Sequence, residues 1–490
     1  MRNIKINSKS LIYLIVTLAI LILIYVTFGK IDNVVITDTL IKQLSIIALF
    51  IWGLCVINCI MNKTSISNLY FLYLLMYGVF IFGYIICKYI FGYIDPKAFD
   101  LNKYIHKEYL AQGIILSIYC LIGLHLGYLI SLLIKKTNKQ YTKEKNIYDN
   151  ELSIRVIKKM AIVLIAISLP FVLVSTIDDF KLASVYGYQG VYGSVKVGLA
   201  SISSKIEPLF FIGIMLLMAS YTQNSKKSKI ILAFIIIYNF ILMFLGSRGI
   251  NILRMLVAII FYHIQVKKFS YKNIFVACIL GAVLVNSMVM IKSFRKYGLN
   301  EWIPNIDKII KETATENIFL EILNEMGVAI FPTAVAIEYI EDTQEYKYGT
   351  TYLYGLTTFI PNISSEVHSA VANADTQAMV AKYYGLSFGG SVVQEAYINF
   401  GWYSWIFMAI LGYILSKLSN KILESHSLIG YTLFCVFMVN SLWTIRNNIM
   451  PGLCRDLLWY IVPIYIIYKL IYNGRKKKQS GEVKCINSCL

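Results

Sequence analysis

Three arginines are the residues of this sequence best suited to bind a phosphate group. Arg248 lies in Gly246-Ser247-Arg248-Gly249, where one apolar run ends and the next begins at Ile250 without a real loop. A guanidinium is a planar fork of donors that suits phosphate oxygens. The alternatives, an interfacial arginine whose side chain reaches for water or a salt bridge inside a helix bundle, stay open.

Arg295 and Arg446 are the other two cations of this predicted set. Arg295 stands beside two lysines just after the apolar run 273–291, and Arg446 lies with Arg455 in another turn between apolar runs. Two or three such sites on one face of a membrane could hold a pyrophosphate whose lipid tail lies in the bilayer. Each residue taken alone is more often a solvated charge, and the convergence of the set on one face is what favours a binding site.

Two side chains are candidates for the catalytic base. His368, in the stretch Pro361–His368, could accept a proton from an attacking sugar hydroxyl as a neutral imidazole, although a structural role is the alternative. Glu395 follows Gly389-Gly390 beside the start of an apolar run, where it could act as the base, pair with Arg295 or cap a helix. The choice between His368 and Glu395 stays open.

Three tyrosines near the middle of the chain could stack on sugar rings. Tyr186, Tyr188 and Tyr192 alternate with glycines in a stretch expected to be an external loop, where an interfacial aromatic belt is an equally good interpretation. The five histidines have no zinc-site spacing, and no Gly-rich loop with a following lysine appears. We therefore expect neither a metal nor a cofactor, and a substrate that brings its own activated bond.

The composition shows which kind of element must position these residues. Of 490 residues, 58% are hydrophobic and 15% charged, and the mean hydropathy is +0.64. Soluble globular proteins carry about a quarter charged residues, so the sequence predicts an all-α polytopic integral membrane protein. The formal charge of +19 comes from basic residues between apolar runs, a pattern that orients membrane proteins and does not favour nucleic-acid binding.

Apolar stretches long enough to cross a bilayer predict about twelve transmembrane helices. They lie near 11–28, 40–61, 69–91, 109–134, 160–177, 206–222, 230–245, 250–265, 273–291, 403–418, 427–445 and 457–472.

Basic residues orient these spans. They concentrate in 135–159 and in Arg475-Lys476-Lys477-Lys478, which predicts that both termini are cytosolic. The chain then divides into a bundle of nine helices (1–291), one large external loop between spans 9 and 10 (292–402), and three helices with a basic tail (403–490). Within the loop, apolar residues on one helical face at 318–326 predict a helix that lies on the membrane surface or packs against the bundle.

The motifs and this arrangement together resemble a known family. Gly246-Ser247-Arg248-Gly249 between two spans, the large external segment, and Gly389-Gly390-Ser391 through Glu395 to Gly401 are similar to Wzy-type O-antigen or capsular repeat-unit polymerases. The resemblance implies a glycosyltransferase of the cytoplasmic (inner) membrane that uses undecaprenyl-pyrophosphate-linked oligosaccharide as donor and acceptor. It implies transfer of the growing glycan onto a new repeat unit at the outer face, without metal or cofactor.

The resemblance also assigns roles and partners. Its motifs fall on Arg248 for pyrophosphate and on Glu395 for catalysis, whereas Arg295 and His368 match by placement only. A flippase and a chain-length regulator are the expected protein partners, beside the lipid-linked oligosaccharide and the bilayer.

Two other functions remain open from the sequence. A lipid-linked oligosaccharide flippase or transporter would show ionisable residues at mid-membrane and related halves, and the sequence offers few such residues (His125 is one) and no repeat. A ligase that attaches finished glycan shares the donor and the geometry, so sequence separates it poorly from a polymerase.

Overall fold

The computed structural model describes residues 36–93, 104–134, 151–193, 199–245, 248–269, 317–360, 369–425 and 427–488, with a few single positions elsewhere. Throughout these ranges the regular structure is helical and no strand occurs. Helices satisfy their own backbone hydrogen bonds, which a chain inside a bilayer requires. The predicted all-helical membrane fold is confirmed in this part of the chain.

Within the described residues, eight helical segments are long and apolar enough to cross a membrane. They are Asp38–Met61, Leu69–Ile90, Lys107–Leu133, Glu151–Leu182, Phe319–Thr343, Val392–Glu424, Leu428–Arg446 and Gly452–Lys478. Gly249–Gln265 is a shorter apolar helix. The predicted count of twelve spans is not confirmed, and the predicted runs 11–28 and 273–291 lie mostly or wholly outside the described residues.

The region predicted as one external loop contains a candidate span of its own. Phe319–Thr343 is built from α12 (Ile318–Met326), η6 (Gly327–Ala329) and α13 (Ile330–Thr343). Its polar residues Glu321 and Asn324 break the apolar run in the sequence, yet both are buried. The expectation that 292–402 lacks a span is therefore not confirmed.

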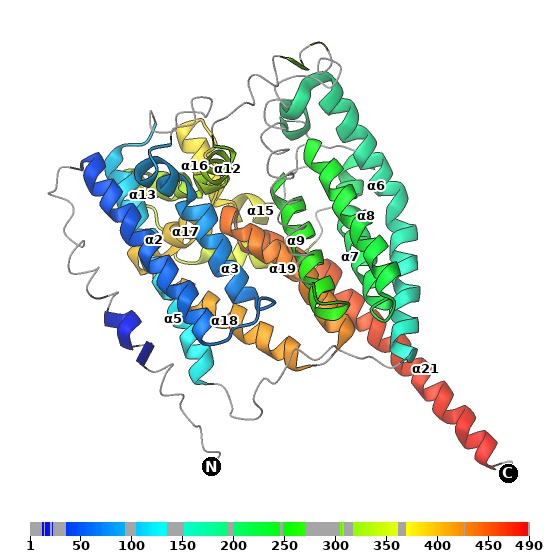
Figure 1. Ribbon diagram of the computed structural model, residues 1–490. Coiled ribbons are helices and arrows are strands. Elements are labelled where there is room, and N and C mark those ends of the chain that lie inside the picture. The colour runs from blue at the N-terminus through cyan, green and yellow to red at the C-terminus, as the bar shows by residue number, and fades with distance from the viewer. Residues whose placement is uncertain are drawn as a thin grey trace. The chain divides into compact units, whose positions relative to one another are not determined.

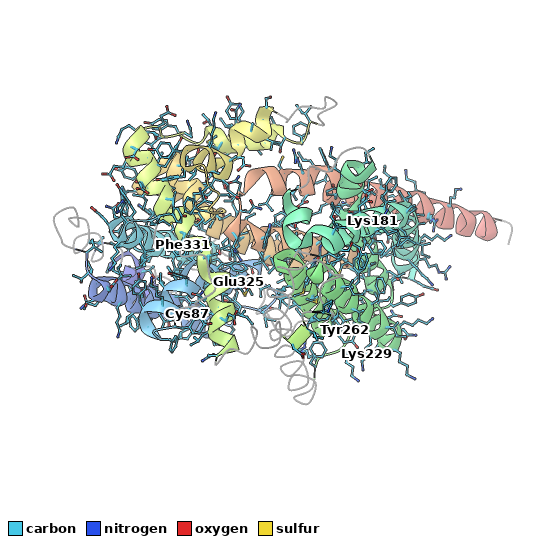
Figure 2. All side chains as sticks on the ribbon, turned by 90° about the horizontal axis from the view of Figure 1, so that it is seen from above. Cys87, Lys181, Lys229, Tyr262, Glu325 and Phe331 are labelled. Atoms are coloured by element: carbon cyan, nitrogen blue, oxygen red, sulfur yellow. The ribbon has the colours of Figure 1, made fainter. Side chains whose placement is uncertain are left out.

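The helix predicted at 318–326 is present and packs against other helices. The Cys87 thiol, in η3 (Ile86–Ile90), donates to the Leu320 carbonyl of α12 at 3.4 Å. The Tyr84 and Phe331 rings meet edge to face at 4.5 Å. Figure 2 shows Cys87 beside the segment that carries Glu325 and Phe331.

The chain forms two compact units, each from non-contiguous segments. The first comprises Met1–Lys143, Phe319–Lys421 and Ser441–Cys454. Its centre is α5 (Lys107–Leu133), which packs with α2 (Asp38–Met61), α3 (Leu69–Tyr77), α13 and α17 (Val392–Phe400), the last being the helix that carries Glu395 (Figure 1).

Glycines bring α5 and α18 (Ser404–Glu424) into backbone contact. A Cβ built on Gly127 would lie 1.8 Å from the Ala409 carbonyl oxygen, and one on Gly412 would lie 2.0 Å from the Leu124 oxygen. Small residues permit this close approach between helices in membranes. The crossing places α18, and α17 directly before it in the chain, against the core of the first unit.

The second unit comprises Glu144–Ile318, Ile422–Asn440 and Arg455–Leu490. It contains α6 (Glu151–Gly193), α7 (Leu199–Ser220), α8 (Ser225–Phe244) and α9 (Arg248–Gln265), and α6 runs alongside α7 (Figure 1). The hairpin predicted around Arg248 is present, because α8 ends at Phe244 and α9 begins at Arg248.

The prediction that Tyr186, Tyr188 and Tyr192 lie in a loop is wrong, because this stretch is helical. All three belong to α6, which continues to Gly193. The glycines between them do not end the helix, since α6 packs along α7 and tertiary contact overrides a weak local preference.

The chain after α19 (Leu428–Trp443) is helical up to Ser488, apart from a short turn. It forms η8 (Thr444–Arg446), α20 (Met450–Arg455), η9 (Asp456–Ile461) and α21 (Val462–Ser488). Six further short helices are described: η2 (Gly78–Phe82), α4 (Gly83–Ile85), α14 (Thr350–Thr357), α15 (Ser369–Ala374), α16 (Thr376–Tyr384) and η7 (Gly401–Tyr403). They belong to the first unit.

Candidate active site around Glu395

The motif that begins at Gly389 forms the start of α17. Ser391 caps this helix, its hydroxyl accepting from the Gln394 N–H while the Gln394 side chain accepts from the Ser391 N–H. Such a reciprocal capping box defines where a helix starts. The Ser391 hydroxyl also contacts that of Thr333 on α13 at 2.9 Å, so the start of α17 is fixed to a second helix.

Glu395 lies one turn into α17 and is completely buried. Its Oε2 accepts from the Ile449 N–H at 2.6 Å, while its Oε1 has no hydrogen-bond partner among the described residues. Ile449 directly precedes α20, so this bond joins α17 to the turn before that helix. A buried polar atom without a partner is unfavourable, and in native proteins it often marks a functional position.

The buried phenol of Tyr352 is close enough to Glu395 to be affected by its charge. Burial, and next the charge of Glu395, raises the pKa of Tyr352 on α14 well above its ordinary value. The phenol therefore stays protonated at physiological pH and can donate, yet its hydroxyl has no partner within the described part of the chain. Its ring stacks on Phe407 at 4.6 Å. The site thus holds an unused acceptor and an unused donor.

Arg446 is the predicted cation that the structure brings to the same region of the first unit. It ends η8, three residues before the Ile449 that binds Glu395. Its guanidinium lies 5.6 Å from the centre of the Phe80 ring, within range of a cation–π contact. The turn from Arg446 to Ile449 therefore carries both a candidate phosphate ligand and the hydrogen bond to Glu395.

The other predicted residues do not join this cluster in the described structure. Arg248 is the first residue of α9 in the second unit, and the tyrosines 186, 188 and 192 belong to α6 of that unit. Arg295 and His368 lie outside the described residues. The predicted Glu395–Arg295 pairing also falls outside them.

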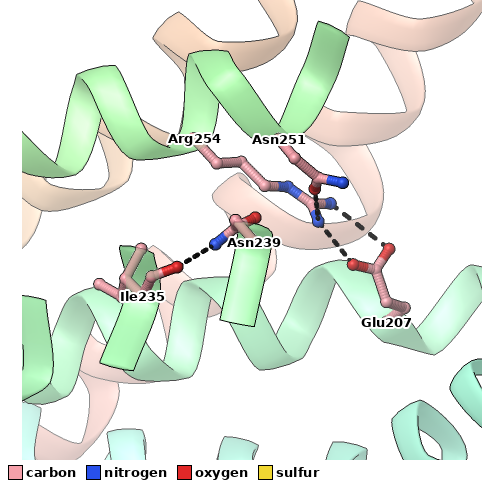
Figure 3. A network of polar contacts seen from close by, with 5 residues as sticks. All are labelled: Glu207, Ile235, Asn239, Asn251 and Arg254. Atoms are coloured by element: carbon pink, nitrogen blue, oxygen red, sulfur yellow. Dashed lines mark hydrogen bonds and ion pairs between the residues drawn. The ribbon is translucent and has the colours of Figure 1, made fainter. Parts of the chain in front are cut away.

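An ion pair in the second unit involves residues that were not among the sequence-based candidates. Arg254 on α9 donates to both carboxylate oxygens of Glu207 on α7, at 2.7 and 3.4 Å, and to the Asn251 oxygen at 3.4 Å (Figure 3). Arg254 is a lone cation in the apolar run 250–265, and such a charge almost always has a partner. This isolation in the sequence indicates that Arg254 has a buried partner, but it does not identify Glu207 as that partner.

Metal ligands do not cluster in the described part of the chain. No group of three or more His, Cys, Asp or Glu side chains there is arranged to hold an ion.

The fold and this site define a multi-pass helical membrane protein with a buried, partly unsatisfied carboxylate. Comparison with protein families is more specific: the family model for O-antigen polysaccharide polymerase Wzy matches residues 10–478, nearly the whole chain. The chain belongs to this family. It is an O-antigen repeat-unit polymerase, a glycosyltransferase-type enzyme that acts on a lipid-linked oligosaccharide in a membrane. Searches of curated proteins and of solved structures give no significant match.

Proposed function

We propose that the polymerase uses undecaprenyl-pyrophosphate-linked oligosaccharide as both donor and acceptor. A hydroxyl of the new repeat unit attacks the anomeric carbon of the growing glycan. The bond from that carbon to the pyrophosphate oxygen breaks, and the lipid pyrophosphate leaves with the bonding electrons. Because the donor is already activated, the protein must supply a base and positive charge for the leaving group.

Glu395 is the proposed base that accepts the hydroxyl proton. The observation that carries this assignment is the buried Oε1 without a hydrogen-bond partner among the described residues, in a chain of the polymerase family. The protonated Tyr352 beside it supports the assignment, since a phenol can donate to a sugar oxygen. His368 stays the alternative base.

Arg248, Arg295 and Arg446 are proposed to bind the pyrophosphate. Arg446 has the strongest support, because it lies three residues before Ile449, whose N–H binds Glu395. Tyr186, Tyr188 and Tyr192 stay proposed sugar contacts, now presented from a helix.

The reaction is proposed to occur at the outer face of the cytoplasmic membrane, with both termini in the cytosol. The basic residues at 475–478 support this orientation. A flippase that delivers repeat units and a protein that regulates chain length are the proposed partners.

A deletion strain tests the function. We expect cells without this protein to display single, unpolymerised repeat units on their outer surface, detected by lectin or antibody and by gel. Units that accumulate facing the cytosol would instead identify a flippase, and full-length polymer left on its lipid carrier would identify a ligase. Complementation with Arg248→Ala should give normal protein levels without a polymer ladder, whereas a persisting ladder removes Arg248 from the mechanism.

A further inference from the structure

Two adjacent asparagines connect Glu395 to a distant helix. Asn447 and Asn448 lie between η8 and α20, immediately before the Ile449 whose N–H binds Glu395 Oε2 at 2.6 Å. Their side chains hold three successive residues at the start of α16, about 70 positions earlier in the chain. We call Asn447, Asn448, Asp375, Thr376 and Gln377 the asparagine clasp.

Both polar atoms of the Asn448 side chain are used in the clasp. Its Nδ2 donates to Asp375 Oδ1 at 2.7 Å, and its Oδ1 accepts from the Thr376 hydroxyl at 2.7 Å. Asp375 also caps α16, because the same Oδ1 accepts from the Ala378 N–H at 3.1 Å. Asn448 therefore binds both Asp375, which caps α16, and Thr376, the first residue of that helix.

Asn447 completes the clasp through Gln377. Its Oδ1 accepts from Gln377 Nε2 and from the Asn448 N–H. The Gln377 side chain lies directly against Gly390, where an added Cβ would stand 2.2 Å from Gln377 Nε2. The second glycine of the Gly389-Gly390 motif is thus required for close approach, and it joins the clasp to the start of α17.

The clasp determines where the N–H of Ile449 points. One hydrogen bond leaves a carboxyl group free to rotate unless the donor itself is fixed. Here the donor sits in a turn that is tied to α16 by three side-chain bonds and to α17 by the packing of Gln377 on Gly390. Catalytic groups held in this way keep the geometry that a transfer reaction needs, and small displacements are costly.

We propose that Asn447 and Asn448 are positioning residues for glycan transfer. The clasp holds the Ile449 N–H in place, this N–H binds Oε2 of Glu395, and Oε1 is left to accept the proton of the acceptor hydroxyl. This inference rests on the proposed role of Glu395 as the base. It adds two residues that touch neither the carboxylate nor the reacting atoms.

Purified full-length protein allows the test, with lipid-linked repeat units extracted from the deletion strain as the probe. We expect Asn448→Ala to lower kcat on the order of 10-fold while KM changes less than about 3-fold. The matched control is Asn62→Ala, since Asn62 also supports a turn of the first unit, through side-chain bonds to Asn58 four residues away. Its kcat should stay at the wild-type value.

A swapped pair separates positioning from general stability. Asn448→Asp alone sets two carboxylates against each other, because Nδ2 of Asn448 lies 2.7 Å from Asp375 Oδ1, and it should lower kcat at least as much as Asn448→Ala. Adding Asp375→Asn removes one of the two charges and restores a donor for the new carboxylate. Because Oδ1 of Asp375 serves both contacts, the introduced amide must turn so that its nitrogen faces residue 448 and its oxygen faces the Ala378 N–H. We expect the double variant to recover kcat to within about 3-fold of wild type, as coupled residues do.

The outcomes distinguish this inference from the proposed function. Loss of activity in Glu395→Gln with unchanged kcat in Asn448→Ala overturns the clasp and leaves Glu395 as the base. Full activity in Glu395→Gln would show that Glu395 is not the base, and it would overturn the positioning role of the clasp as well. If Asn448→Ala does not fold, the swapped pair decides: recovery of kcat supports the clasp, and a double variant no more active than Asn448→Asp overturns it.

Discussion

At the scale of single residues, Glu395 combines features that rarely occur together. Its side chain is completely buried, one oxygen is held by a backbone N–H, and the other has no partner within the described residues. A purely structural carboxylate would be expected to satisfy both oxygens, because an unpaired buried acceptor destabilises the fold. A substrate hydroxyl bound at Oε1 would supply the missing donor.

Glu395→Gln is the sharpest substitution at this scale. Glutamine keeps the shape and an oxygen acceptor for the Ile449 N–H but cannot take a proton. We expect the rate of transfer to fall by roughly 10²–10⁴-fold, the usual contribution of a general base, with normal insertion in the membrane. The rate is measured with lipid-linked repeat units and purified protein. Glu341→Gln, an exposed residue of α13, is the matched control. Equal activity in the two variants would leave His368 as the base.

At the scale of elements, the two units rely on different interactions. In the first unit, α5 and α18 meet through glycines, so that backbone packs on backbone. In the second, α7 and α9 are joined by the Arg254–Glu207 ion pair, and the Arg254 guanidinium also lies 5.3 Å from the centre of the Phe211 ring. Both arrangements suit a bilayer, where hydrophobic burial contributes little to association between helices.

Substitution of Gly127 tests the α5–α18 crossing. A Cβ there would stand 1.8 Å from the Ala409 oxygen, so Gly127→Ala must push the helices apart and should cost about 1–3 kcal/mol of stability. Gly53→Ala on α2 is the control, because no atom lies within 4 Å of its added Cβ. There the better helix propensity of alanine should leave stability unchanged or raise it. The unfolding temperature in detergent checks both, and equal shifts would contradict the crossing.

Glu207→Gln tests the ion pair of the second unit. The substitution removes the carboxylate that is paired with the buried Arg254, which should cost roughly 3 kcal/mol, toward the low end for a buried pair because Glu207 is 26% exposed. Glu151→Gln is the control. It breaks the surface pair with Arg155 and should change stability by less than about 1 kcal/mol. Indistinguishable unfolding curves for the two variants would show that the Arg254 pair does not hold α7 to α9.

At the scale of the whole molecule, the chain folds as two units, and the family match from residue 10 to 478 covers both. Each unit combines three segments that are separated in the chain. The range 292–402, predicted as an external loop, contributes α13, α16 and α17 to the first unit. The matched range therefore includes these helices as well as the rest of both units.

The proposed topology predicts where Tyr348 lies. This residue is 79% exposed in the turn before α14. In a variant without reactive cysteines, Tyr348→Cys should react with a membrane-impermeant maleimide added to intact cells. Lys476→Cys, in the basic C-terminal stretch, should react only after the cells are opened. Labelling in the reverse order would place Glu395's surroundings on the cytosolic side and contradict transfer at the outer face.

Much of this architecture was predictable because it depends on local composition. Apolar runs such as 40–61 and 109–134 became helices with nearly the predicted bounds, since any such run must form a helix in a bilayer. The hairpin before Arg248 followed from the absence of loop residues between two runs. Phe319–Thr343 escaped prediction because its buried Glu321 and Asn324 resemble surface residues in a one-dimensional pattern.

The sequence by itself determined the class of protein, the helices of long apolar runs such as 40–61 and 109–134, and the motif that contains Glu395. Only the tertiary structure decided the partners: Ile449 for Glu395, Glu207 for Arg254, and the two asparagines for the start of α16. The physical reason is that hydrophobic pattern and capping act within a few residues, whereas these bonds join residues 47 to 73 positions apart. Such contacts form only when packing brings distant helices together.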